Sequence, residues 1–421
     1  MNATWWRSAV TGSVVLAVIL SLATTGWTSG FRNPPVGGEG ARPVFTDDAT
    51  AIAHNPANLV SLKDPEALAS LTILTSKSEF DSPLGASAST EDPWKLLPNL
   101  FFAWPVKQDK LAAGVGITTP YGQSTVWPED SILRYTAPYY AQLRVVDVSP
   151  CLAGKIGDTL SLGVGADLFW SDLKLKQIYS WYNATGNPAD PDGEADFSGE
   201  GEGYGGNVGV SWQVTKRQKM ALTYRSAVKV EYDGDFDISH LPLSELPLMM
   251  QLMVSPRSDF STDIDFPAIA ALGYGIQATD QLRVEADVEW VEFSRFDALP
   301  LDVGGNNLLL PSTSLREDWK DSWTFGLSAD WQFSEALALR AAYTFIQSPI
   351  PDDTFSPTLP DADQHAISIG IGYQHGGHAL DLTCAFSLFD KRDISGNDNP
   401  AYDGTYDINS TLASVSYRYS F

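Results

Sequence analysis

The stretch that decides the fold runs from Trp323 to Phe345 and reads WTFGLSADWQFSEALALRAAYTF. Its first part alternates apolar with polar or small residues up to Phe333, and its second part does the same from Leu337 onward. A period of two is typical of a β-strand, because successive side chains point to opposite faces of a sheet. The tripeptide SEA between the two parts is short enough for a tight turn. The stretch therefore predicts two antiparallel strands.

The sense of the alternation separates two kinds of sheet. A soluble sandwich buries the apolar face, whereas a membrane barrel turns it toward lipid and keeps the polar face toward the lumen. In this chain the polar face carries charges and glycines, and the apolar face carries Leu, Ile and Val with aromatic residues at its ends. This distribution favours the membrane barrel.

The same pattern continues from about residue 67 to the C-terminus. It predicts a 14-stranded antiparallel transmembrane β-barrel, all-β in class, with strands at 67–80, 98–107, 111–121, 136–155, 160–178, 203–214, 219–232, 262–278, 281–296, 321–333, 336–348, 364–374, 378–389 and 406–421. Every second connection is short (KQDK, IGDT, TKRQ, TDQ, SEA and QHGGH), and the others are long and rich in Asp, Pro and Gly. Short turns at one end and long loops at the other are typical of an outer-membrane barrel with periplasmic termini. The final aromatic, Phe421, resembles the signal that the outer-membrane assembly machinery reads.

The composition excludes several classes of protein. The chain has 421 residues, 27 of them basic and 52 acidic, and its net charge of −25 is unsuited to nucleic-acid phosphates. Hydrophobic residues make up 43% and aromatic residues 11%, which argues against disorder. No apolar run of about 20 residues follows residue 25, so a polytopic helical membrane protein is excluded. The length alone suggests about two or three soluble domains, but the strand pattern predicts one barrel.

Residues 1–29 are predicted to be a secretory signal peptide. Arg7 is their only charged residue, the apolar core AVTGSVVLAVILSLA is short for a membrane span, and small residues follow it. A retained N-terminal anchor is the alternative. Export places a multi-pass barrel in the bacterial outer membrane. Cys151 and Cys384 fall on non-adjacent predicted strands, so we expect two free thiols.

Residues 30–66 do not fit the strand pattern. They contain GFRNPP, two glycine-rich turns and the acidic segment TDDATAIAHNPANLVSL. A barrel of this size has a lumen wide enough to need filling if it is not to be an open hole. We therefore predict a signal peptide at 1–29, an N-terminal hatch inside the lumen at 30–66, and the transmembrane barrel at 67–421.

Several motifs in this order and spacing resemble the FadL-type long-chain fatty-acid transporters of the outer membrane, a family that includes toluene-channel relatives. The motifs are Gly30-Phe31, Asp47-Asp48-Ala49, Asn55-Pro56-Ala57, TPYG (119–122), IGDTLSLGVG (156–165), GEGYGGNVGVSW (201–212), LTYRSAVKVEYDG (222–234) and SPIPDDTFSPTLPDADQHAISIGIGY (348–373). The resemblance covers essentially the whole mature chain. It implies uptake of hydrophobic molecules and a kinked third strand that opens a gap in the wall.

A long loop at residues 233–261 is the predicted capture site for a hydrophobic ligand. It contains HLPLSELPLMMQLMVSP, with three of the five methionines of the chain. An exposed apolar loop usually marks a binding surface, and Met makes such a surface adaptable; a loop that only caps the barrel is the alternative. The predicted ligand-binding residues are Phe31, Leu243, Leu246, Leu248, Met249, Met250, Leu252 and Met253.

The third strand and the hatch supply the predicted gate. Pro120 cannot donate a ladder hydrogen bond, so it predicts a kink or a strand end, and Gly116 and Gly122 add flexibility. A lateral gap there would let an apolar ligand reach the outer leaflet without crossing the polar lumen. The turn Asn55, Pro56, Ala57 is predicted to fix the hatch to the wall, and Phe31 to fill the pocket until a ligand displaces it. Packing alone is the alternative for both.

Charged residues are also predicted on the lumen face. Basic ones could meet a carboxylate head group, but acidic neighbours on the same face favour ion-pair networks. The predicted inward charges are Arg225, Lys229, Arg283, Arg340, Glu231, Glu285, Asp287, Glu289, Asp330 and Asp381.

No catalytic, metal or cofactor site is predicted, because the five histidines are too scattered to form one. We expect a monomeric, non-enzymatic channel for passive uptake of long-chain fatty acids or similar hydrophobic molecules, in contact with lipopolysaccharide and outer-membrane lipid. The rival function within the family is uptake of aromatic or alkane hydrocarbons. From other classes, the rivals are a general diffusion porin, an adhesin and a barrel enzyme.

Overall fold

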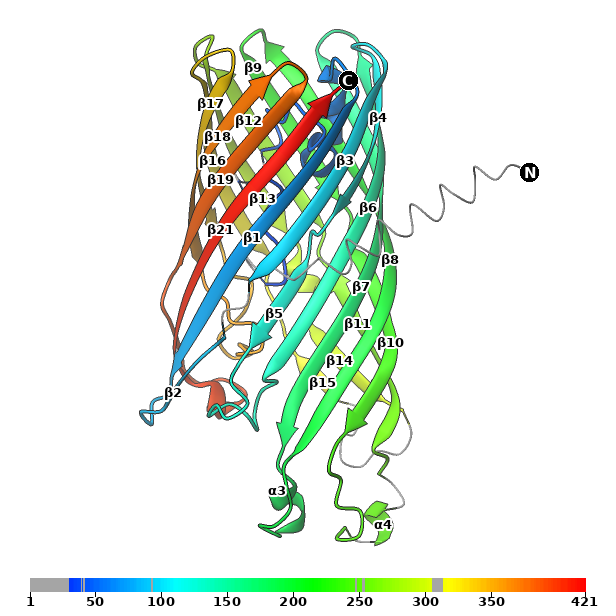
Figure 1. The fold of residues 1–421 in the computed structure, drawn as a ribbon, viewed down its shortest axis with the longest axis vertical. Coiled ribbons are helices and arrows are strands. Elements are labelled where there is room, and N and C mark those ends of the chain that lie inside the picture. Colours follow the sequence, from blue (N-terminus) through cyan, green and yellow to red (C-terminus); the bar gives the residue numbers. More distant parts are fainter. Residues whose placement is uncertain are drawn as a thin grey trace, which may run out of the picture.

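The computed structural model describes residues 30–38, 40, 42–91, 94–246, 248–251, 254–304 and 313–421. The predicted signal peptide lies outside these residues. The chain forms a closed antiparallel β-barrel of 14 strands (Figure 1). The barrel closes because the last strand, β21 (Gly404–Ser420), pairs along its whole length with the first, β1 (Glu66–Asp81). The predicted fold is confirmed.

The wall strands follow one another in chain order. Besides β1 and β21, the continuous ones are β3 (Lys95–Lys107), β6 (Tyr140–Ile156), β7 (Leu160–Tyr179), β8 (Gly193–Thr215), β13 (Leu282–Val291), β16 (Ser322–Gln332), β17 (Leu337–Ile346), β18 (Gln364–His375) and β19 (His378–Phe389). The others are each broken in two: β4 (Leu111–Thr118) with β5 (Gly122–Val126), β9 (Gln218–Arg225) with β10 (Val228–Ile238), and β11 (Arg257–Phe266) with β12 (Ile269–Gln277). All the strands predicted from the sequence are present.

The remaining elements are short. They are the loop strands β2 (Ser87–Ser89), β14 (Ala298–Val303), β15 (Thr313–Arg316) and β20 (Arg392–Ile394), and the helices α2 (Ala51–His54), η1 (Pro56–Ser61), α3 (Trp181–Thr185), α4 (Leu248–Gln251), η2 (Phe293–Arg295) and η3 (Pro400–Tyr402). In Figure 1, β2, α3 and α4 lie at the end of the barrel opposite the C-terminus. Among the described residues, no helix has the length and apolar character needed to cross a bilayer.

The outer face of the barrel is apolar, as the alternation predicts. On β16 the side chains of Trp323 and Phe325 are 44% and 50% exposed, whereas Thr324 between them is 5% exposed. Side chains on a strand alternate between its two faces, so the apolar residues here point outward and the polar ones inward. Cys151 on β6 and Cys384 on β19 are free thiols, as predicted.

The breaks in the wall strands change which side chains face inward. On β9, Arg225 is directed into the barrel, where it pairs with the buried carboxylate of Asp147. Residues 226–227 interrupt the strand, and on β10 the buried residue is Val228. The interruption shifts the period by one residue.

This shift overturns one prediction. Lys229 and Glu231 were expected on the lumen face, but their side chains are 49% and 81% exposed. Their neighbours on β10, Val230, Tyr232 and Phe236, are buried instead. Beyond the breaks, on the side of the long loops, β10 therefore turns apolar side chains inward and charged side chains outward. This arrangement is the opposite of the one on β16.

Candidate functional site

Residues 30–65, called the N-terminal segment here, are joined by hydrogen bonds to inward-facing side chains of the wall. The backbone amides of Val44 and Phe45 donate to the two carboxylate oxygens of Glu285 on β13, at 2.7 and 3.0 Å. Arg42 pairs with Asp330 of β16 at 2.5 Å. Figure 1 shows the segment inside the barrel, near the end that carries the C-terminus.

The predicted Asn-Pro-Ala turn lies at the start of η1. The Asn55 side-chain oxygen accepts from the Ala57 amide at 3.1 Å and so caps this short helix. Its amide nitrogen donates to the Pro43 carbonyl at 2.9 Å and to the Ser211 hydroxyl of β8 at 3.1 Å. The turn thus has hydrogen bonds both to its own segment and to the wall, as expected if it fixes the segment to the wall.

Two glycines of the wall let this turn approach closely. A Cβ at Gly209 would lie 2.1 Å from the Asn55 side-chain oxygen, and a Cβ at Gly163 would lie 2.4 Å from the Ala57 amide nitrogen. Neither distance is sterically possible, so any larger residue at these positions has to displace the turn.

Most of the predicted lumen charges form ion pairs. Arg340 binds Asp381 at 2.5 Å and approaches Asp330 at 3.6 Å, and Arg283 lies 3.4 Å from Asp330. The ion-pair network that the sequence favoured over a head-group site is therefore present.

The third wall strand is interrupted at Thr119–Tyr121, so the prediction that Pro120 kinks or ends the strand is confirmed. Before the interruption, β4 pairs with β3 on one side and with β6 on the other. After it, β5 starts at Gly122 and, among the described residues, pairs with β6 alone as a strand. The ladder of β3 with β1 covers residues 95–103, whereas its ladder with β4 covers only residues 100–107. Within the described residues, the β3–β4 ladder therefore stops at the interruption.

The N-terminal segment supplies some of the missing partners. The Gly122 amide donates to the Phe31 carbonyl at 2.8 Å, and the Asn33 amide donates to the Pro120 carbonyl at 3.0 Å. The Asn33 side chain also donates to the Thr119 carbonyl at 2.8 Å. The first described residues of the chain therefore hold the edge of the break from inside.

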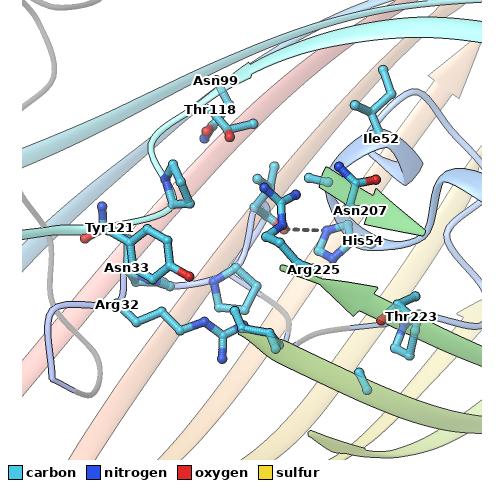
Figure 2. Close-up of a pocket in the computed structure, with 18 of the residues that line it drawn as sticks. Arg32, Asn33, Ile52, His54, Asn99, Thr118, Tyr121, Asn207, Thr223 and Arg225 are labelled. Carbon is cyan, nitrogen blue, oxygen red and sulfur yellow. Dashed lines mark hydrogen bonds between the residues drawn. The ribbon is translucent and has the colours of Figure 1, made fainter. Parts of the chain in front are cut away.

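A cavity of about 120 Å³, called the smaller cavity here, lies between the break and the N-terminal segment (Figure 2). Asn99 and Thr118 line it from the broken part of the wall, and Arg225 lines it from β9. His54, at the end of α2, also lines it and forms the hydrogen bond to the Val36 carbonyl drawn in Figure 2, at 3.2 Å. Its lining mixes polar and charged side chains with apolar ones, such as Ile52, Leu97 and Pro120.

A cavity of about 520 Å³, called the larger cavity here, has a mainly apolar lining. This volume lies within the range of roughly 300–1,000 Å³ that is usual for small-molecule sites. Its apolar lining includes Phe31, Leu143, Leu173, Leu175, Ile178, Ala195, Phe197, Ile264, Phe296, Leu299, Leu301, Leu315, Trp319, Ile350 and Leu359.

Phe31 belongs to an aromatic cluster beside the larger cavity. Its ring stacks on Trp319 at 5.2 Å between centroids and meets Phe266 edge-on at 5.3 Å. Only 2% of Phe31 is exposed. Arg32 and Asn33, the next two residues, line the smaller cavity. The two cavities therefore adjoin across residues 31–33.

The predicted capture loop does not reach the larger cavity in the part of the chain that the structure describes. Leu248 is 69% exposed and Leu243 is 40% exposed, whereas Leu246 is buried; none of the three lines the cavity. Leu252 and Met253 lie outside the described residues, as do the side chains of Met249 and Met250. The capture role of the loop stays a prediction.

Sequence reasoning missed most of the residues that line the larger cavity. It placed apolar faces toward lipid along the whole of each strand. A usable signal was present, because Arg144 and Lys174 alternate with Leu143 and Leu173. A charged face does not belong in lipid, so the apolar face of these stretches had to point inward.

Two carboxyl groups of the long loops lie near the apolar lining, the half-buried Glu317 and the buried Asp361. Glu317 lines the larger cavity and accepts a hydrogen bond from Trp319 Nε1 at 2.9 Å, and burial raises its pKa to about 7. Asp361 accepts from the Gly30 amide at 3.2 Å and from the Ser348 hydroxyl at 2.9 Å, and burial raises its pKa to about 7 as well. Within the described ranges, no group of three or more His, Cys, Asp and Glu is placed to hold a metal ion.

A closed barrel with an apolar outer face, an internal N-terminal segment and an apolar cavity defines an outer-membrane transport barrel. Residues 35–421 match the family described as outer membrane protein transport protein (OMPP1/FadL/TodX). The chain belongs to this family and is a multi-pass protein of the bacterial outer membrane. The resemblance drawn from the motifs is confirmed.

Individual relatives are distant but span the chain. A long-chain fatty acid transport protein of Escherichia coli O6:H1 is 23% identical, with 99% of each chain covered. The crystal structure of a Pseudomonas aeruginosa FadL homologue has a TM-score of 0.79 at 19% identity, covering 95% of this chain and 100% of that one. The Ralstonia pickettii toluene transporter TbuX has a TM-score of 0.70 at 19% identity, covering 96% and 100%. These structural likenesses establish the fold.

Proposed function

We propose that this protein is a passive outer-membrane channel for long-chain fatty acids or similar hydrophobic molecules. The observation that carries the proposal is the apolar cavity of about 520 Å³ next to a break in the barrel wall. An apolar solute gains free energy by leaving water for such a site. The names of two relatives, a long-chain fatty acid transport protein and a toluene transporter, agree with this class of cargo.

The proposed route has three stages. The loop around α4 captures a hydrophobic molecule from outside, and the larger cavity binds it after Phe31 moves. The molecule then leaves through the wall beside Pro120 into the outer leaflet, so it never crosses the charged lumen. The contacts of residues 31–33 with the strand break support this order, because movement of Phe31 would pull on the segment that holds the break.

Uptake of aromatic or alkane hydrocarbons is the second candidate, and the apolar lining of the larger cavity favours it. A general diffusion porin is less well supported, since the N-terminal segment lies in the lumen. Contact with lipopolysaccharide, recognition of Phe421 by the assembly machinery, and a monomeric state remain predictions.

Native mass spectrometry of the purified protein tests the proposal directly. We expect a co-purified hydrophobic small molecule in the wild type, and a strong loss of it in Ala195→Trp, because an indole there fills the cavity that Ala195 lines. Ala166→Trp on the exposed face of the neighbouring strand β7 is the matched control and should retain the ligand. Equal occupancy in both variants would place the ligand elsewhere and contradict the proposal.

The capture loop gives a second test. Replacing Leu248, Met249 and Leu252 by Ser removes apolar surface from the loop. Uptake at low substrate concentration should fall by about threefold or more, since each buried methylene contributes about 0.8 kcal/mol. Leu84→Ser, at a side chain 94% exposed between β1 and β2, is the control. Unchanged uptake in the triple variant would contradict the capture role and would indicate that the loop only caps the barrel.

A further inference from the structure

The larger cavity has no basic side chain in its described lining. Its polar members are Glu317 together with hydroxyl and amide groups such as those of Tyr402, Gln123 and Gln177. Every Lys and Arg of the chain except Arg7 belongs to the described residues. A carboxylate head group in this cavity would therefore be buried without a cationic partner, which is costly.

Most of the cations that flank this lining along the chain are already engaged. Arg134 pairs with Asp192 at 2.5 Å, and Lys176 pairs with Glu194 at 2.8 Å. Arg316, next to Glu317 in the chain, forms ion pairs with Asp318, Asp353 and Asp398. An anionic ligand would have to compete with these carboxylates for each cation.

Glu317 itself sets the polarity of the cavity. Trp319 donates to its Oε2 atom, but no described residue donates a hydrogen bond to its Oε1 atom. A buried carboxyl oxygen gains from a hydrogen-bond donor. A ligand hydroxyl group can supply that donor, whereas a ligand carboxylate would repel the ionised Glu317. The pKa of about 7 leaves Glu317 mostly ionised at pH 8.

The two arginines that line the smaller cavity, on the proposed way out, are already engaged as well. Arg225 binds the buried carboxylates of Asp147 at 2.9 Å and Asp167 at 2.8 Å, and Arg32 pairs with Glu289. An anion in this cavity would have to compete with these carboxylates for both guanidinium groups.

We propose that the larger cavity selects neutral hydrophobic molecules that carry a hydroxyl group, such as aliphatic alcohols or phenols, over carboxylates of the same length. Glu317 is the specificity-determining residue and accepts the ligand hydroxyl. This inference rests on the proposed uptake of hydrophobic molecules and narrows the cargo from that class to neutral molecules, away from ionised fatty acids.

The test compares 1-decanol with decanoate, which differ only in the head group. Their dissociation constants are measured at pH 8 on the purified full chain in non-ionic detergent, by competition with a bound neutral fluorophore. We expect decanol to bind at least about tenfold more tightly. In Glu317→Gln the ratio should fall at least about fivefold, chiefly because decanoate binds better. Glu335→Gln, which removes the same charge from an exposed turn between β16 and β17, should leave the ratio unchanged.

A second variant covers the case in which Glu317→Gln does not fold. Gln177→Lys places a cation in the cavity lining and should shift the preference toward decanoate. Wild-type protein that binds decanoate as tightly as decanol would overturn the selectivity while leaving hydrophobic uptake intact. If neither ligand binds and the protein retains no hydrophobic molecule, the proposed function fails as well.

Discussion

Thr119→Trp is expected to reduce uptake of a hydrophobic substrate by at least about tenfold while leaving its binding in the larger cavity nearly unchanged. Thr119 is 7% exposed and lines the smaller cavity, whose volume is about 120 Å³. An indole ring would fill most of that space, and interiors tolerate such overpacking poorly. Initial uptake rates in cells, together with ligand titration of the purified protein, separate passage from binding.

Matched variants decide whether the wall break is the route. Thr223→Trp fills the same cavity from β9 and should also block uptake. Val115→Trp adds an indole to the outer face of β4, where Val115 is 38% exposed, and should transport normally. Normal uptake in both cavity-filling variants would contradict the lateral route and favour passage toward the periplasmic end.

The strands could be predicted because their signal is local. The hairpin of β16 and β17 forms in the register that its alternation suggests, with Phe325 opposite Phe345 on the outer face. The break at Pro120 was also predictable, since proline cannot complete a ladder. The break at residues 226–227 contains no such marker. Its consequence, the outward position of Lys229 and Glu231, could not be obtained from a uniform period of two.

The candidate site was predictable only in part. Phe31 and the turn at Asn55 stand in recognisable motifs, and both have specific contacts in the structure. The larger cavity is different, because its lining comes from strands and loops far apart in the sequence, from Leu143 through Phe197 to Leu359. Each of these residues resembles any other apolar strand or loop residue. Two features bring them together: apolar side chains turn inward on the long-loop side of the strand breaks, and the barrel closes. Neither feature has a short-range sequence pattern.

Gly209→Leu is expected to convert a nearly closed lumen into a leaky one. Even the first carbon of the new side chain would lie 2.1 Å from the Asn55 side-chain oxygen, so the turn from Asn55 to Ala57 has to leave the wall. It would then lose its hydrogen bond to Ser211. Liposomes with wild-type protein should pass small sugars far more slowly than a porin does, and the variant should pass them at least about tenfold faster, since opening the plug leaves a wide polar lumen.

The same substitution at Gly154 on β6 is the matched control. The nearest atom to a Cβ there is the Lys110 carbonyl oxygen at 3.9 Å, an ordinary contact, so Gly154→Leu should keep the slow flux of the wild type. Gly163→Leu displaces the same turn from β7 and should leak like Gly209→Leu. Agreement between the two variants would show that the leak does not arise from a local defect in one strand. Slow flux in both turn-displacing variants would show that the Asn-Pro-Ala turn does not keep the lumen closed. Fast sugar flux through the wild type would contradict the hypothesis of a plugged channel and would favour a general diffusion porin.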